Sequence, residues 1–218
     1  MKILLCSVLS IISLFSLQAH AQRRFSISVT GAPAYSYTDF TGTVLIPGTN
    51  GQFVPTTLTS ESAFFGVSVG AMASYRFSRE WSLSTGLWYD RLTQTKPDPS
   101  PVSADAKIIM SSLKIPVLFN YKPFTTRLAP YFTVGGLINQ AQPTRLINVL
   151  APNTDESILF ASSATYRAVL GAGVTYRINN HFSVIVQPML LYRFRPNRTY
   201  ERFVSYQLNG QTQLVYTF

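Results

Sequence analysis

Cysteine and histidine are almost absent from this sequence. Cys6 is the one cysteine among 218 residues, and it lies in an N-terminal segment that we interpret below as a removable leader. The mature chain is therefore expected to have no disulfide and no catalytic or metal-binding thiol. Of the two histidines, only His181 lies beyond the leader, so a zinc site built from several His and Cys ligands is excluded and no cofactor is expected.

Charged residues are also scarce. They make up 12% of the chain, about half of the usual share. The 18 Lys and Arg residues outnumber the 9 Asp and Glu residues, but the cations are scattered along the chain rather than clustered. We therefore expect anionic membrane lipid, including lipopolysaccharide, as the partner of this charge, and not nucleic acid. Asp155 and Glu156 form the only adjacent acidic pair, for which a solvated loop and a calcium site both remain open.

Long apolar runs are missing after the N-terminus. Lys2 is followed by an apolar run from Ile3 to about Leu17 and then by Ala19-His20-Ala21, the small-x-small pattern of a signal-peptidase site. The run is shorter than the roughly 20 residues of a spanning helix. We predict a signal peptide over residues 1–21, removed on export, and a single domain over residues 22–218.

The apolar residues that remain alternate with polar ones at period two, which is typical of β-strands. An exported chain with little charge and no spanning helix can cross a membrane only as a closed barrel. We therefore predict an all-β fold, an eight-stranded antiparallel up-and-down transmembrane β-barrel. The predicted strands are Phe25–Thr30, Phe65–Phe77, Trp81–Asp90, Leu113–Tyr121, Leu128–Leu137, Tyr166–Arg177, Phe182–Arg193 and Tyr206–Phe218.

The predicted connections alternate in length, as they do in outer-membrane barrels, which have short periplasmic turns and longer extracellular loops. This order predicts both termini in the periplasm. The first long connection contains Gly48-Thr-Asn-Gly51 between two apolar stretches, so it is a candidate hairpin that extends the barrel wall. Short turns are predicted at 78–80, 122–127 and 178–180, and long loops at 36–61, 92–105, 139–157 and 195–202.

Three features favour a barrel that faces lipid over a soluble periplasmic barrel that binds a ligand inside. The polar face of the strands is made largely of Ser, Thr, Gln, Asn and Gly, which suits a narrow hydrogen-bonded lumen. Tyr and Trp residues lie near the ends of the apolar face, where membrane interfaces are expected. The chain ends on Leu214, Tyr216 and Phe218, which share one strand face and are typical of the C-terminal signal read by the barrel-assembly machinery.

Several segments together resemble a known family. They are the leader, Val69–Tyr89, Leu113–Tyr121, Ala129–Gly136, Gly171–Arg177 and the final Phe218. These resemble the outer-membrane β-barrel family abundant in Bacteroidetes, which includes PorT-like proteins and is similar in architecture to the small OmpA and OmpX barrels. The resemblance implies location in the outer membrane of a Gram-negative bacterium. It also implies, as one candidate role, a part in protein secretion.

Two groups of residues are candidate sites. We predict a polar network inside the barrel, in which Asp90 pairs with one of several inward cations because a buried cation needs a partner. A second cationic group brackets the fourth long loop, where guanidinium groups suit lipopolysaccharide phosphates; a solvated charged rim is the alternative. The network residues are Arg76, Asp90, Lys114, Arg167, Arg177 and Arg193, and the lipopolysaccharide group is Arg193, Arg195, Arg198 and Arg202.

No catalytic residue is predicted. His181 follows a short turn on the expected periplasmic side, away from the rim where a barrel protease would need it. An eight-stranded barrel is filled by its own side chains, so a general porin role is disfavoured. We expect a non-enzymatic outer-membrane barrel with a structural or interaction role through its extracellular loops, with other envelope proteins among its candidate partners. The alternatives are a PorT-like secretion component, a lipid-modifying enzyme and the soluble ligand-binding barrel.

Overall fold

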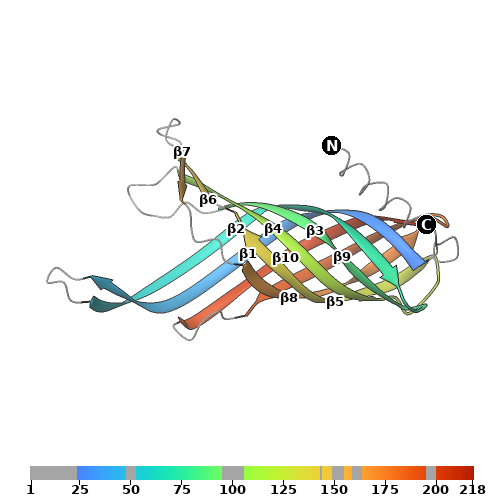
Figure 1. Ribbon diagram of the computed structural model, residues 1–218, viewed down its shortest axis with the longest axis horizontal. Helices are drawn as coiled ribbons and strands as arrows, with labels where there is room; N and C mark the ends of the chain where they lie inside the picture. Colours follow the sequence, from blue (N-terminus) through green and yellow to red (C-terminus); the bar gives the residue numbers. More distant parts are fainter. Residues whose placement is uncertain are drawn as a thin grey trace, which may run out of the picture.

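The computed structural model describes residues 24–47, 53–94, 106–142, 144–148, 155–158, 164–194 and 200–218. The predicted signal peptide and the Gly48–Gly51 turn lie outside these residues. The described part forms one antiparallel sheet of ten strands (Figure 1). The strands are β1 (Phe25–Pro47), β2 (Phe53–Arg76), β3 (Trp81–Gln94), β4 (Ala106–Tyr121), β5 (Leu128–Ala141), β6 (Thr144–Asn148), β7 (Asp155–Ile158), β8 (Ala164–Arg177), β9 (Phe182–Arg193) and β10 (Tyr200–Thr217).

The sheet closes on itself. Its strand order is β3-β2-β1-β10-β9-β8-β5-β4, and β4 pairs back with β3, so that these eight strands form a barrel. The predicted fold class is confirmed. The strands β6 and β7 lie outside the ring. Strand β6 pairs with the first residues of β4, Ala106–Ile109, which extend beyond the end of β5. Among the described strands, β7 pairs with β6 alone. The loop predicted at 139–157 therefore contains a short hairpin.

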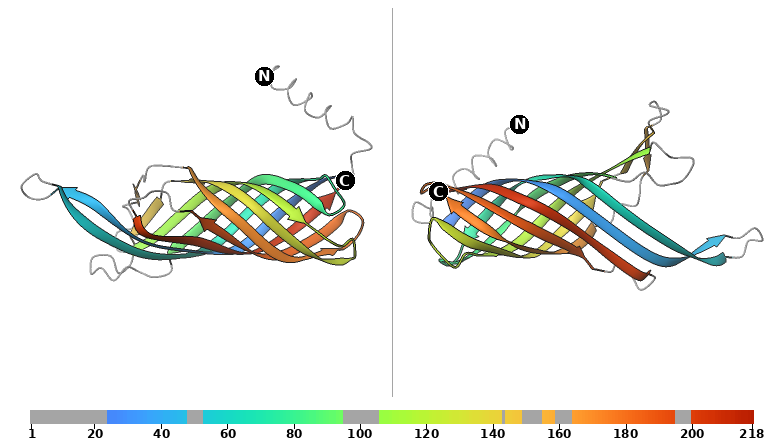
Figure 2. Two further views of the ribbon diagram at one scale, coloured as in Figure 1. Left: turned by 90° about the horizontal axis from the view of Figure 1, so that it is seen from below. Right: turned by 180° about the vertical axis from the view of Figure 1, so that it is seen from behind.

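The two ends of the barrel differ. At one end, which we call the turn end, β2, β4 and β8 are joined to the next strand by the short connections predicted from the sequence. The C-terminus lies at this end, where the Phe218 amide donates to the Phe25 carbonyl oxygen. The opposite end, which we call the loop end, carries the long connections and the hairpin formed by β1 and β2 (Figure 2).

The hairpin is much longer than expected. Strands β1 and β2 pair without interruption from Phe25 and Tyr75 to Pro47 and Phe53. The candidate hairpin in this stretch is confirmed, but the bounds of the loop predicted at 36–61 are wrong, since most of these residues are strand. The Thr and Ser residues of this stretch are compatible with a pleated ladder in water, and cross-strand pairing satisfies backbone groups that a loop would leave to solvent. The loop predicted at 195–202 is shorter for a similar reason, because β10 begins at Tyr200.

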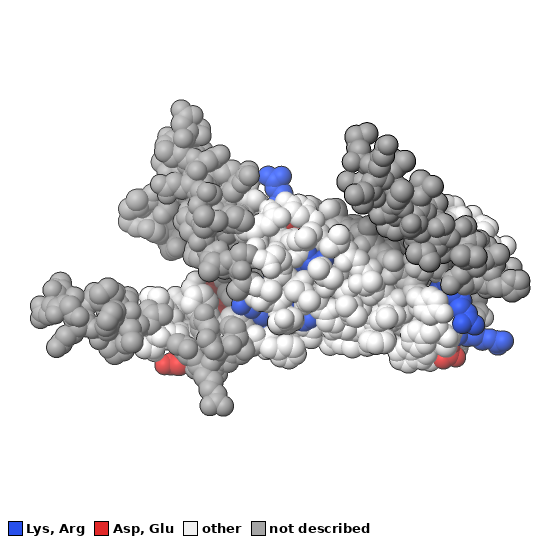
Figure 3. Space-filling model, viewed as in Figure 1, with Lys and Arg blue, Asp and Glu red and all other residues white. Residues whose placement is uncertain are grey.

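The outer wall of the barrel is an apolar belt. Val29, Val67 and Leu170 each expose more than half of their surface, and the belt continues over all eight barrel strands. Figure 3 shows one face of this wall mostly white, with charged residues at the turn end and others toward the loop-end half. A water-soluble barrel would bury this face, so the belt excludes the soluble alternative. Among the described residues, no helix is long and apolar enough to cross a membrane.

The sequence suggested a polar interior, but the interior of the barrel is only partly polar. A buried apolar cluster fills part of it, formed by Met72, Trp88, Leu118, Leu137, Val169, Met189 and Leu191. The indole of Trp88 lies against Gly70 on the neighbouring strand, where an added Cβ would collide with Trp88 Cδ1 and with the Leu87 carbonyl oxygen. Gly70 therefore leaves the space that the largest interior side chain occupies.

Candidate functional site

A buried ion pair lies near the loop end of the interior. Asp90 on β3 and Lys114 on β4 both point inward, and the strand register offsets them by two residues, because Trp88 is the direct partner of Lys114. The Lys114 ammonium donates a hydrogen bond to Asp90 Oδ2, and each side chain is only 1% exposed. Charge-assisted pairing of this kind offsets the cost of removing both ions from water.

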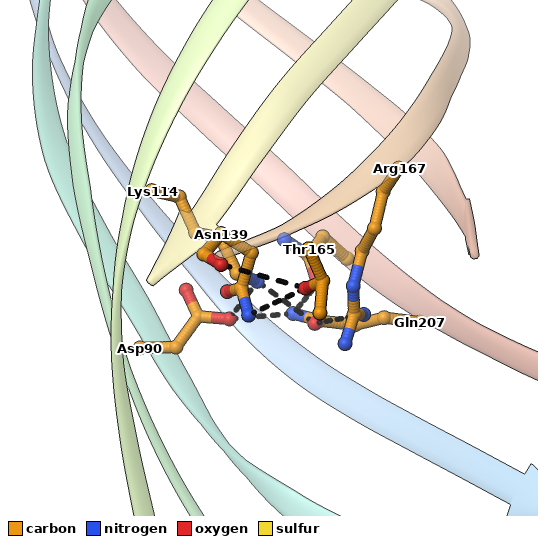
Figure 4. A network of polar contacts seen from close by, with 7 residues as sticks. Asp90, Lys114, Asn139, Thr165, Arg167 and Gln207 are labelled. Atoms are coloured by element: carbon orange, nitrogen blue, oxygen red, sulfur yellow. Dashed lines mark hydrogen bonds and ion pairs between the residues drawn. The ribbon is translucent and has the colours of Figure 1, made fainter. Parts of the chain in front are cut away.

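Gln207 on β10 joins this pair to a second cation. Its Oε1 accepts from Lys114 Nζ at 2.8 Å and from Arg167 Nη1 at 3.2 Å. Its Nε2 donates to Asp90 Oδ2 at 2.8 Å and to Asn209 Oδ1 at 2.9 Å (Figure 4). The amide thus contacts the carboxylate and both cations, and it ties four strands together across the lumen. Gln207 was not among the predicted network residues, although its inward position on β10 follows from the alternation of the strand.

The network holds more positive than negative charge. Lys114 and Arg167 face a single carboxylate, that of Asp90. Asp90 Oδ1 and Arg167 Nε are buried without a hydrogen-bond partner among the described residues. Beside them, Asn139 and Thr165 hydrogen-bond to each other, with Nδ2 of Asn139 donating to Thr165 Oγ1 at 3.3 Å. The hydrogen bonds of Gln207 therefore carry much of the stabilisation of this layer.

A second polar layer crosses the barrel nearer the turn end. Thr133 Oγ1 lies at its centre, within 3.0 Å of Asn120 Oδ1 and 3.1 Å of Gln187 Oε1. From there the chain of hydrogen bonds continues to both sides of the wall, through seven strands. Its members are Ser74, Ser84, Asn120, Thr133, Gln187, Gln211 and Thr30. The two polar layers and the apolar cluster together fill the middle of the lumen.

The structure divides the predicted network residues into two groups. Asp90, Lys114 and Arg167 lie together, and Arg193 is also on the inner wall toward the loop end, with its guanidinium 5.4 Å from the centre of the Phe203 ring. Arg76 and Arg177 are at the turn end, where β2 and β8 finish, and they do not join this network.

The predicted lipopolysaccharide contact stays a prediction. Arg202 is 69% exposed on the outer side of β10 and forms an ion pair of 3.1 Å with Asp39 Oδ2. Arg193 faces inward, so it is poorly placed for an outside phosphate. Arg195 and Arg198 lie outside the described residues. The C-terminal signal also stays a prediction; Tyr216 and Phe218 stack edge to face at 5.1 Å, and Leu214 is exposed on the same face.

His181 lies in the turn between β8 and β9. Its Nδ1 is 3.1 Å from the Thr217 carbonyl oxygen, and its ring stacks on Tyr216 with 5.8 Å between centres. These contacts hold the turn against the end of β10. Within the described residues, no group of three or more His, Cys, Asp or Glu residues is placed to hold a metal ion. The Asp155 and Glu156 side chains are outside the description.

The comparison with protein families agrees with this architecture. Residues 17–139, more than half of the chain, match the outer membrane protein beta-barrel domain. The chain belongs to this family. As an outer membrane beta-barrel protein it is assigned to the outer membrane of a Gram-negative bacterium, and its apolar belt faces lipid. No curated protein matches the sequence.

Several solved structures are similar to this outer membrane barrel at low sequence identity. Neisserial surface protein A is 12% identical with a TM-score of 0.49, over 88% of this chain and 99% of that one. OprG from Pseudomonas aeruginosa is 13% identical with a TM-score of 0.45, over 91% and 98%. The outer membrane protease OmpT from Escherichia coli is 8% identical with a TM-score of 0.44, over 90% and 97%.

Proposed function

We propose that this outer membrane protein is not an enzyme and that it acts by presenting the β1–β2 hairpin to partner proteins outside the cell. The observation that carries the proposal is the length of the hairpin. On one side, β1 pairs with β10 only as far as Gly42, and on the other, β2 pairs with β3 only from Phe64 onward. Beyond these positions β1 continues for five residues, to Pro47, and β2 extends over the eleven residues from Phe53 to Ala63.

The free edge of β2 suits protein recognition. Between Thr57 and Ala63 no described strand pairs with β2 on the side away from β1. Such an edge offers backbone donors and acceptors to an added strand of another chain. The hairpin is held in shape by polar cross-strand contacts, such as Tyr37 to Glu61 at 3.1 Å. Together with the unbroken β1–β2 ladder, these contacts favour an ordered hairpin as the platform.

The filled lumen supports an interaction role over transport. Two hydrogen-bonded layers and the apolar cluster around Trp88 occupy the middle of the barrel. An eight-stranded barrel leaves little space beyond its own side chains. A solute would have to displace a buried ion pair to pass.

The location of His181 supports a non-enzymatic role. A barrel protease of the expected kind needs a histidine at the loop end, and His181 is at the turn end, bonded to the Thr217 carbonyl oxygen. A lipid-modifying enzyme remains a weaker alternative. It predicts changed lipid A acylation on overexpression that disappears in His181→Ala.

Two finer assignments remain part of this proposal. We place the turn end, with both termini, in the periplasm, and the hairpin outside. The resemblance to PorT-like proteins of Bacteroidetes offers secretion as another role. Loss of type IX cargo export on deletion of the gene would favour secretion, and normal export would remove that alternative.

The topology is tested by cysteine labelling, since the predicted mature chain has no cysteine of its own. Ser60→Cys on the hairpin should react with a membrane-impermeant maleimide in intact cells. Thr125→Cys in the turn after β4 is the matched control, and it should react only after the outer membrane is permeabilised. The reverse pattern would overturn the proposed orientation.

The interaction is tested by shortening the hairpin. Gly42 and Leu58 are cross-strand partners, so replacing residues 43–57 with a two-residue turn should leave the barrel intact. A photo-crosslinking residue at Ser62 should capture a surface protein in the full chain. Capture should weaken strongly in the shortened chain, which lacks the projecting end of the hairpin and keeps only residues 58–63 of the free edge. Equal capture by both chains would contradict the hairpin as the platform. Heat-modifiable migration on SDS-PAGE checks that both barrels are folded.

A further inference from the structure

Three cations lie close together at the turn end of the barrel. Arg76 ends β2, Lys122 follows β4, and Arg177 ends β8. Each lies two residues beyond an inward-pointing polar residue, so all three continue the inner wall of the barrel rather than the lipid-facing one. We call this group the turn-end cation cluster. It is separate from the Asp90 network and from the hairpin.

The cluster adjoins a polar cavity. Arg76 and Lys122 line a pocket of about 70 Å³, together with Ser26, Tyr131, Thr175 and Gln213. A cavity needs roughly 10–15 Å³ to hold one water molecule. The pocket is several times larger, so it has room for a small oxyanion. Most of the lining side chains carry a hydroxyl or an amide, which can donate to oxygen. The pocket opens at the turn end of the barrel.

The cations have no carboxylate partner within the described part of the chain. The two ion pairs there are Lys114 with Asp90 and Arg202 with Asp39. Glu80 and a further cation, Arg79, also line this pocket, and Glu80 forms no ion pair with the cluster. Burial, and then the charges of Arg76 and Arg177, lower the pKa of the half-buried Lys122. Like charges held together in this way favour a bound anion.

We propose that the turn-end cation cluster binds a phosphate group. Arg76 supplies a planar guanidinium group that can contact two phosphate oxygens at once, and Lys122 supplies a point charge at the same pocket. Arg177 is exposed and outside the pocket lining, and it adds positive charge close to Lys122. The hydroxyl and amide groups of the pocket donate to the remaining oxygens. The phosphate is either free in solution or the headgroup of a phospholipid in the surrounding leaflet. The proposal is independent of the hairpin, which is at the other end of the barrel.

The test uses the full mature chain, folded in a neutral detergent without phosphate. Inorganic phosphate is titrated while binding is followed by calorimetry, and a short-chain phosphatidylglycerol in mixed micelles is titrated in parallel. Saturable binding should weaken at least tenfold in Lys122→Gln and in Arg76→Gln. Arg24→Gln removes an exposed charge near the same end, outside the pocket lining, and should leave binding unchanged.

The outcomes separate the two sources of phosphate. Binding of inorganic phosphate alone identifies a soluble ligand, and binding of the lipid with no response to inorganic phosphate identifies a headgroup. No saturable binding of either probe would overturn the proposal. Equal weakening by Arg24→Gln, or equal binding of chloride, would overturn it as well, since both would mean simple charge screening. Heat-modifiable migration on SDS-PAGE checks that each variant is folded. Lys122→Gln should disturb folding least, because Lys122 lies in the turn after β4.

Discussion

Lys114 and Asp90 form an ion pair inside the barrel, on neighbouring strands, with both side chains almost wholly buried. Gln207 contacts both of them from β10. The pair lies where a membrane barrel would otherwise have an open lumen. Its strength therefore determines both the stability of the barrel and the closure of the path through it.

Removing the carboxylate should be costly. Asp90→Asn leaves Lys114 and Arg167 buried without a counterion, and we expect a loss of about 3–5 kcal/mol in the free energy of unfolding. The double variant Asp90→Leu with Lys114→Met should lose much less, because neither charge remains unpaired. Urea unfolding of the detergent-folded protein, followed by heat-modifiable migration, measures both. Equal losses would contradict the account.

The amide of Gln207 should matter more than its uncharged character suggests. Gln207→Leu removes its four hydrogen bonds and leaves Arg167 with an additional unsatisfied donor. We expect a loss of about 2–3 kcal/mol by the same unfolding measurement, since hydrogen bonds to charged groups are lost. Gln213→Leu, near the pocket end of the same strand, serves as the control and should lose less. A smaller effect at position 207 than at 213 would contradict the importance of the network.

Gly70 should tolerate no larger residue. Gly70→Ala places a methyl group against the Trp88 ring and the Leu87 carbonyl oxygen, and we expect overpacking to cost about 1–3 kcal/mol. Gly31→Ala is the matched control on β1, because nothing lies within 4 Å of the added Cβ. Folding yield into detergent and urea midpoints compare the two. A loss at position 31 as large as at position 70 would show that strand glycines act through the backbone alone.

The lowered pKa of Lys122 should make the free energy of unfolding depend on pH. Its pKa in the folded protein is lowered from the usual 10.5, chiefly by burial and then by Arg76 and Arg177. Between the lowered value and 10.5 the unfolded chain binds more protons than the folded one, so this contribution to stability rises with pH. In phosphate-free buffer, Lys122→Gln should therefore be more stable than the wild type at pH 7. The difference should shrink as the pH approaches 10.5, and a difference independent of pH would refute the assignment.

The barrel itself could be predicted from the sequence because its strands alternate so regularly. The short turns were placed correctly for the same reason, since each interrupts a clear pattern. A hairpin was predicted in this connection, but its length was not, because residues 36–61 are rich in Thr and Ser on both faces. A strand surrounded by water has no apolar face to mark it, so periodicity separates it poorly from a polar loop.

The interior was predicted less well than the wall. Asp90, Lys114 and Arg167 were identified as inward charges, and the structure brings these three together. Arg76 and Arg177 were assigned to the same network, but alternation gives only the face of a residue and not its depth along the barrel. The apolar layer around Trp88 and the role of Gln207 depend on which strands face each other across the lumen. Strand pairing in space, rather than any local pattern, determines this.

The seam between β1 and β10 joins Ser26 to Thr217, nearly the whole length of the described chain apart. The first strand of the barrel therefore has no partner on that side until the last residues have been synthesised and exported. Until then the chain has two open sheet edges, both prone to pairing with other molecules. Barrel closure is thus a late event that depends on the C-terminal residues, and a truncation of β10 should leave an unclosed sheet rather than a smaller barrel.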